Sequence, residues 1–341
     1  MAAWHLKGGL GYSHLACWLL AHFASLCLAA VERAGTTTRL PSFGEDRIFN
    51  GTDARYIVSV EAAGARCAIA ADFDEDGYMD LVVASSNDNT VAWYRRLEDG
   101  SYSTKNMITR ASNGARIVAV GDIDQDGLVD VVSASYYDHT VRWFQNLGGS
   151  FGSAHVITTS AFGAQGVTLA DLDNDGDLDV LSASSGDHTI AWYENLGDEG
   201  RFCEVRKIVD TASIGVRTVI SADFNHDGLP DLAAASKDDN TIAWYRNLGG
   251  TRFEKIVIDS AARGAYSLVA TDVDEDGNID LVTAANMEGV TETSGEGGKV
   301  SFYRNIFADG AVDFSKVAVT AEDDLDYFVL SVWAGDLDGD G

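Results

Sequence analysis

Nine-residue acidic segments recur along the chain at intervals of about fifty residues, and the first of them, residues 72–80, reads D-F-D-E-D-G-Y-M-D. Each complete copy has carboxylate or amide side chains at positions one, three, five and nine, and glycine at position six. Ca²⁺ takes six to eight oxygen ligands, and a short loop wraps around it only if alternate side chains point inward and a glycine permits the sharp turn. The spacing therefore predicts five calcium-binding loops.

The candidate ligands of each loop are its four polar side chains and the backbone carbonyl of position seven. Asn225 keeps an oxygen ligand but removes one charge, so we expect the fourth site to be weaker. In chain order the ligands are Asp72, Asp74, Asp76, Tyr78 and Asp80; Asp122, Asp124, Asp126, Leu128 and Asp130; Asp171, Asp173, Asp175, Asp177 and Asp179; Asp223, Asn225, Asp227, Leu229 and Asp231; Asp272, Asp274, Asp276, Asn278 and Asp280; and, in a truncated sixth copy, Asp336, Asp338 and Asp340.

Acidic segments of this kind have two other interpretations, a turn without metal and an EF-hand. Asp and Gly favour turns without any metal, but a turn needs one or two such residues, whereas here four oxygen side chains recur at the same offsets. An EF-hand requires a glutamate at position twelve. That position holds Val83, Ser133, Ser182, Ala234 and Thr283, so no EF-hand fits.

The composition predicts a folded and strongly acidic protein. The 341 residues are 46% hydrophobic and carry a formal net charge of −29, from 53 acidic and 24 basic residues. This balance disfavours nucleic acid and anionic membrane surfaces as partners. Five bound Ca²⁺ would bring −29 to −19, so we expect strong self-repulsion in the calcium-free protein.

The N-terminal thirty residues predict a targeting segment. An apolar run over 15–30 follows a weakly basic start, which indicates a secretory signal peptide, with an uncleaved membrane anchor as the alternative. Residues 31–47 are expected to be a linker. A membrane contact is expected only through such an anchor or through a span beyond residue 341. The triplet Asn50-Gly51-Thr52 is a candidate glycosylation site.

Four cysteines do not suggest a disulfide framework. Cys17 and Cys27 lie in the signal segment, which leaves Cys67 and Cys203 at non-equivalent positions of different repeats. We expect these two to be buried free thiols.

The segments between the loops predict four antiparallel strands per unit. In the second unit these are residues 114–121, 131–135, 141–146 and 153–158. Four short strands in a unit of about fifty residues, repeated along the chain, are typical of a β-propeller. We therefore predict an all-β chain whose residues 48–341 form four-stranded antiparallel blades, about five of them complete and one truncated, as a fragment of a larger propeller.

An aromatic pair recurs in the third strand of each unit. Trp93, Trp143, Trp192 and Trp244 are each followed by Tyr or Phe, and we expect these side chains to pack between blades and not to bind a ligand. The fifth unit departs from the others through residues 286–298, a Gly/Glu/Thr-rich segment expected to be a surface loop.

Two further motifs accompany the loops. The pattern A-S-x-x-D-[N/H]-T-[V/I]-x-W-[Y/F] follows the first four loops, and N-L-G triplets begin at Asn146, Asn195 and Asn247. With the acidic loops, they resemble FG-GAP/VCBS-type repeats of integrin α-subunit propellers and of many secreted proteins, over about residues 48–341. The resemblance implies a calcium-stabilised β-propeller with roles in cell adhesion or in carbohydrate or protein binding.

The expected function is a non-enzymatic binding or adhesion module, secreted or at the cell surface, with about five structural Ca²⁺ and an extracellular protein or glycan as its ligand. The chain lacks HExxH and P-loop motifs. His139 and His188 stand where other repeats have Asn89 and Asn240, which favours a role in the turn.

Two alternatives to this module remain open. One is a calcium-dependent carbohydrate-active enzyme, of the polysaccharide lyase or dehydratase type, on the same propeller, with Tyr136, Tyr137, His139 and Arg142 as its best cluster. The other is a purely structural repeat within a larger surface protein. In either arrangement, the up-and-down strand order places the calcium loops on one face. Turns between second and third strands lie on the opposite face, where we expect a partner to bind.

Overall fold

The computed structural model describes residues 62–285 apart from 198, residues 299–318 apart from 309, Ser59, and the two-residue strands β1 (Thr38–Arg39) and β2 (Ile48–Phe49). The predicted signal segment, the Asn50 sequon, the 286–298 segment and the truncated sixth loop lie outside the described residues. None of the described residues belongs to a helix with the length and apolar character of a membrane span.

Besides the short β1–β2 pair, the described part of the chain forms five four-stranded antiparallel sheets, each made of consecutive strands in chain order. We call them blades one to five. They are β3 (Ala65–Ala71), β4 (Asp80–Ser85), β5 (Thr90–Tyr94) and β6 (Asn106–Thr109); β7 (Ala115–Gly121), β8 (Asp130–Ser135), β9 (Thr140–Phe144) and β10 (His155–Thr158); β11 (Ala164–Ala170), β12 (Asp179–Ser184), β13 (Thr189–Tyr193) and β14 (Lys207–Asp210); β15 (Val216–Ala222), β16 (Asp231–Ser236), β17 (Thr241–Asn247) and β18 (Phe253–Asp259); and β19 (Ala265–Thr271), β20 (Asp280–Ala285), β21 (Lys299–Ala308) and β22 (Ala311–Ala318).

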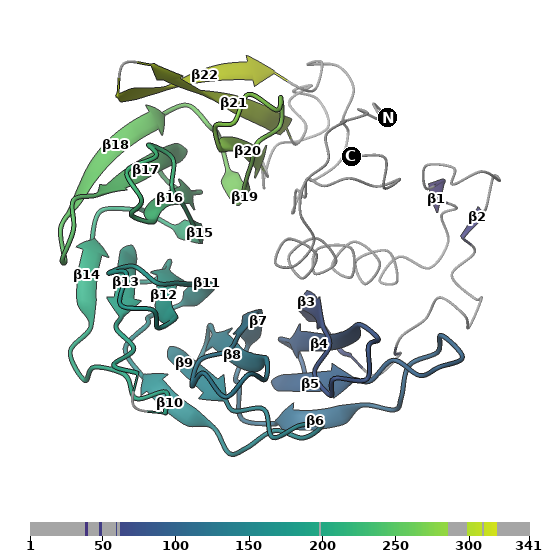
Figure 1. The fold of residues 1–341 in the computed structure, drawn as a ribbon. Coiled ribbons are helices and arrows are strands. Elements are labelled where there is room, and N and C mark those ends of the chain that lie inside the picture. Colours follow the sequence, from purple (N-terminus) through teal and green to yellow (C-terminus); the bar gives the residue numbers. More distant parts are fainter. Residues whose placement is uncertain are drawn as a thin grey trace.

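The blades stand side by side along an arc in a propeller-like arrangement (Figure 1). The first strand of each blade lies innermost and the fourth outermost, and the first strands of consecutive blades contact one another. The prediction of four-stranded antiparallel blades is confirmed, with strand bounds within about two residues of those expected for the second unit.

Burial follows the position of a strand within its blade. All six residues of β8 are buried, and the second strand of every blade is buried without alternation, with Val282 of β20 partly exposed. Both faces of such a strand are covered, which is why its hydrophobic residues do not alternate with polar ones. The fourth strand, at the outer edge, is partly exposed; β10 is an example.

The aromatic pairs fill the spaces between blades, as predicted. Trp93 of blade one and Phe144 of blade two belong to one core cluster. Trp143 of blade two likewise packs in a cluster with Tyr193 of blade three, and the next two junctions repeat the arrangement. Each pair therefore sends one ring into each of the two neighbouring junctions.

The turn between second and third strands links each blade to the next. His139 has a backbone φ of 60° and its Nδ1 accepts a hydrogen bond from the N–H of Gly163, at 3.0 Å. Asn89 takes the same place in blade one, and its Oδ1 accepts from Gly114 N–H at 2.8 Å. Equivalent bonds join His188 to Gly215 and Asn240 to Gly264. The predicted role of the histidines in the turn is consistent with these bonds.

Cys67 and Cys203 are free, as expected, but both residues are only partly buried. The Cys67 thiol lies near the carbonyl of Val118, and burial raises its pKa to about 11. The expectation of buried thiols is therefore met at the Cys67 sulfur, whereas Cys203 is a partly buried residue.

Candidate metal centre

The first aspartate of each acidic loop fixes the loop's backbone. Asp72 accepts hydrogen bonds from the N–H groups of Asp76 and Gly77, at 3.1 and 2.9 Å. The same pair of bonds forms in the other four loops. Gly77 has a φ of 86° and open space where a Cβ would stand, so glycine is needed there for its backbone angle.

The aspartate at position five closes the second half of the loop. Asp76 Oδ1 accepts from the N–H of Tyr78 at 2.9 Å, and this bond also recurs in every loop. The carbonyls of position seven, predicted as ligands from Tyr78, Leu128, Asp177, Leu229 and Asn278, remain a prediction.

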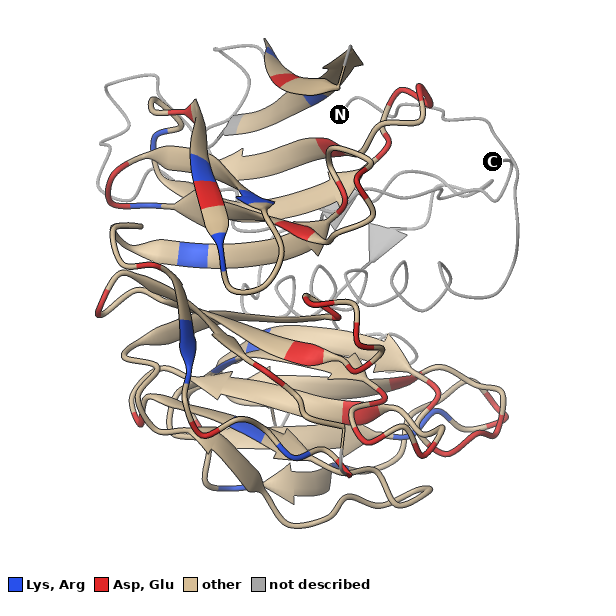
Figure 2. Ribbon diagram, turned by 60° about the vertical axis from the view of Figure 1, so that its left-hand side comes forward, with Lys and Arg blue, Asp and Glu red and all other residues tan. Residues whose placement is uncertain are grey.

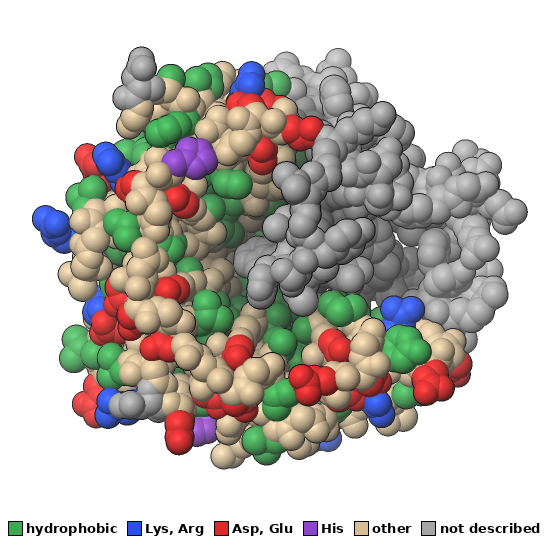
Figure 3. All heavy atoms as spheres, in the orientation of Figure 1, with side chains coloured by type: hydrophobic (Ala, Val, Ile, Leu, Met, Phe, Trp, Pro, Cys, Tyr) green, Lys and Arg blue, Asp and Glu red, His purple; other side chains and the backbone are tan. Residues whose placement is uncertain are grey.

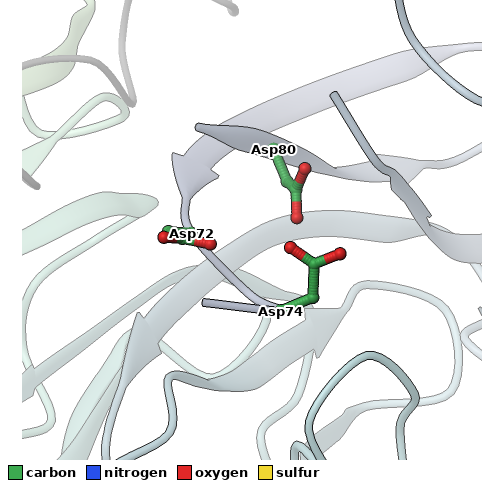
Figure 4. A group of neighbouring side chains, drawn as sticks. All are labelled: Asp72, Asp74 and Asp80. Atoms are coloured by element: carbon green, nitrogen blue, oxygen red, sulfur yellow. The ribbon is translucent and has the colours of Figure 1, made fainter. Parts of the chain in front are cut away.

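Carboxylates converge in four of the five loops. Asp72, Asp74 and Asp80 each offer one oxygen, and the three oxygens lie within 4.8 Å of one another, with Asp80 projecting from the start of β4 toward Asp74 (Figure 4). Asp122, Asp124 and Asp130 form the same group in loop two. In loops three and five the groups are Asp171, Asp173 and Asp175, and Asp272, Asp274 and Asp276.

The oxygens at position three fit a cation. One carboxylate oxygen of Asp74, of Asp124 and of Asp173 is buried and has no hydrogen-bond partner. Buried polar atoms normally have a hydrogen-bond or metal partner, so a bound ligand is expected at each of these three oxygens. Hard oxygen donors grouped at this spacing are the ligand set that Ca²⁺ takes.

The electrostatics of the loops also fit a cation. Burial raises the pKa of Asp124, and the charges of Asp126 and Asp122 raise it further. Burial and the neighbouring Asp175 likewise raise the pKa of Asp173. An ion within the loop would neutralise this repulsion. Acidic residues mark many loops at strand ends in Figure 2, and Figure 3 shows acidic side chains spread along the arc instead of gathered in one patch.

The aspartate at position nine is buried at the start of the second strand. Asp130 accepts from the backbone N–H of Asn146 at 2.7 Å and of Ile123 at 3.1 Å. Burial raises its pKa to about 6, and that of Asp179 to about 7. This residue therefore ties the loop to the turn between third and fourth strands, in addition to its predicted role as a ligand.

Loop four differs from the others. Asn225 Oδ1 accepts from the N–H of Asp227 at 2.9 Å, and its Nδ2 is buried without a partner. No group of three acidic side chains forms in this loop within the part of the chain that the structure describes. A weaker fourth site remains a prediction.

An asparagine whose role the sequence did not reveal connects each of loops two to five to the loop of the preceding blade. Asn146 Nδ2 donates to the carbonyl of Phe73, at 2.8 Å, and to that of Val129. Asn195, Asn247 and Asn305 make the equivalent pairs of bonds. These four side chains are almost fully buried. The recurring N-L-G triplets were the available signal, but the partner carbonyl lies a full blade away in the sequence.

The cluster proposed for catalysis makes contacts within its own turn and with the next blade. Arg142 binds Asp138 through both terminal nitrogens at 3.0 Å, and His139 is engaged with Gly163. Tyr136 lies beneath the guanidinium of Arg116, 4.9 Å from the ring centroid.

The match with a known protein family coincides with the repeats just described. The family model of an FG-GAP-like repeat matches residues 72–133, 122–182, 171–234 and 223–283. Each match begins at the first aspartate of a loop and ends in the second strand of the next blade, and together they span more than half of the chain.

Two solved structures resemble this chain at low sequence identity, and the first of them shares its fold. A lectin from Agrocybe aegerita, described as recognising non-reducing terminal N-acetylglucosamine, is 19% identical with a TM-score of 0.52, over 75% of this chain and 67% of the lectin. The V. cholerae biofilm matrix protein Bap1 is 17% identical with a TM-score of 0.43, over 75% of this chain and 39% of Bap1. No curated protein matches the sequence. At these identities the likeness concerns the fold alone.

Proposed function

Because the chain belongs to the FG-GAP-like repeat family, we propose that it is a non-enzymatic binding module, secreted or displayed at the cell surface, with structural Ca²⁺ in its acidic loops. The observation that carries the calcium role is the set of buried, unpartnered oxygens of Asp74, Asp124 and Asp173. Positions one, three, five and nine, with the carbonyl of position seven, would hold the ion. Its charge would offset the repulsion between carboxylates and so hold the ends of the first two strands together.

The face opposite the acidic loops is the proposed binding surface. It is built from the turns between second and third strands and from the connections between blades. Three large hydrophobic side chains are exposed there: Tyr137, 59% exposed, Phe162 and Ile214. Tyr137 packs over Gly114, where a Cβ would clash with the ring. The ring is therefore held in place although it faces solvent.

A glycan is the ligand class that this surface favours. Aromatic rings with one free face offer the apolar contact that sugar rings stack against, while nearby polar groups bind hydroxyls. Phe162 lies 4.9 Å from the ring of His139, and Tyr136 and Tyr137 pack edge to face at 5.1 Å. The lectin of similar fold recognises terminal N-acetylglucosamine, so glycans that end in this sugar are the first ligands to test.

The test is a glycan array with the purified protein in calcium. We expect binding to glycans with a terminal N-acetylamino sugar, and loss of that binding in a Tyr137→Ala/Phe162→Ala double variant whose melting temperature is unchanged. Leu147→Ala is the matched control, because Leu147 is equally exposed, at 56%, but stands on the face of the acidic loops.

Other outcomes would contradict the proposal. Loss of binding in Leu147→Ala alone would move the binding surface to the calcium face. Turnover of uronic-acid polymers by the wild-type protein would instead favour the carbohydrate-active enzyme.

A further inference from the structure

One position outside the acidic loops changes its charge from blade to blade. It directly follows the aromatic pair of the third strand, and in blades two to five it precedes the asparagine that links neighbouring blades. In blades one, two, three and five its side chain interacts with position three of the loop. The residues at this place are Arg95, Gln145, Glu194, Arg246 and Arg304.

In blades one and five this residue brings a cation into the loop. The guanidinium of Arg95 forms ion pairs with Asp74 and, at 2.8 Å, with Asp76. Arg304 binds Asp274 at 2.6 Å and Asp276 at 3.1 Å. The guanidinium therefore bridges positions three and five, which are two of the predicted calcium ligands.

In blades two and three no cation takes this place. Gln145 donates a neutral hydrogen bond to Asp124 at 2.6 Å. Glu194 adds a carboxylate beside Asp173, although it also pairs with Lys207 at 2.7 Å. Blade four carries Arg246, but Asn225 at position three of its loop offers no carboxylate.

We propose that the residue after the aromatic pair sets the calcium affinity of its loop, with Arg95 and Arg304 acting as built-in counter-cations that weaken loops one and five relative to loops two and three. This inference rests on the proposed calcium role. Ca²⁺ entering loop one must separate the guanidinium from Asp74 and Asp76, whereas in loop two it meets only a neutral amide. An arginine stays charged at any ordinary pH, so the competition does not depend on protonation.

The proposal predicts two classes of calcium site, which isothermal titration calorimetry measures. Arg95→Gln should move one site from the weak class to the strong class, with about a tenfold or greater gain in affinity, since one positive charge near the ion is removed. Gln145→Arg should produce the opposite change in loop two. Lys105→Gln is the matched control, because Lys105 pairs with Asp88 away from the acidic loops. Like Arg95→Gln, it removes one positive charge from the protein.

A second measurement does not depend on added calcium. In EDTA, Arg95→Gln should melt at a lower temperature than Lys105→Gln, because loop one then loses the guanidinium that pairs with Asp74 and Asp76. Unchanged calcium affinities in both Arg95→Gln and Gln145→Arg, in a protein that binds calcium, would overturn this inference alone. A wild-type protein that binds no calcium and melts identically in EDTA would overturn the calcium role together with it.

Discussion

At the scale of single residues, the buried asparagines show how a short motif acts across the molecule. Asn195 uses its backbone N–H for Asp179 and its side chain for Ile123 and Leu178. One side chain thus donates hydrogen bonds to two backbone carbonyls, those of Ile123 and Leu178, which lie outside the strands.

Asn195→Ala should therefore destabilise the protein by about 1–3 kcal/mol, since it leaves buried carbonyls without donors. Urea unfolding measures this change. Asn174→Ala is the control: its Nδ2 also bonds to a carbonyl, that of Gly228 at 2.9 Å, but the bond is exposed. Equal losses in the two variants would show that burial of the bond does not matter.

At the scale of elements, the strands were predictable and parts of the loops were not. Apolar runs and turns that recur at a fixed interval identify the blades, because each repeat of the sequence forms one supersecondary unit. Spacing alone did not reveal that Asp130 is the buried first residue of β8. It also missed the bond from Asn146 to Phe73, because the two residues are 73 positions apart and only meet once blades pack.

The carboxylate at position three should have opposite effects with and without calcium. In calcium, Asp124→Asn should destabilise the protein by about 1.4 kcal/mol for each tenfold loss of affinity. In EDTA the same change should raise the melting temperature, because burial and neighbouring charges disfavour the charged form of Asp124. Thermal melting under both conditions gives the two signs, and destabilisation of equal size in EDTA would contradict the metal site.

At the scale of the whole molecule, the buried aspartates predict how stability depends on pH. Burial raises the folded-state pKa of Asp130 and Asp231 to about 6 and that of Asp179 to about 7, above the usual value of 3.8. Between the usual pKa and the raised folded-state pKa, the folded protein binds more protons than the unfolded chain. The free energy of unfolding therefore falls as the pH rises through this range. In EDTA the melting temperature should therefore increase from pH 8 to pH 5.

Calcium should reverse this dependence. Bound Ca²⁺ requires deprotonated carboxylates, so the stability that it adds is lost as pH falls. The melting curves in calcium and in EDTA should then converge toward pH 5. Parallel curves across this range would mean that the ion, if bound, does not engage the buried aspartates.

The asparagine bonds between blades also bear on how the protein is made. Each one joins a loop to a residue that a ribosome adds 72 to 81 positions later. When a blade has just left the exit tunnel, one carbonyl of its loop still lacks this hydrogen bond. The bond can form only after the third strand of the next blade has been synthesised. We expect blades one to four to be completed in the direction of translation, because each gains this bond from the blade synthesised after it.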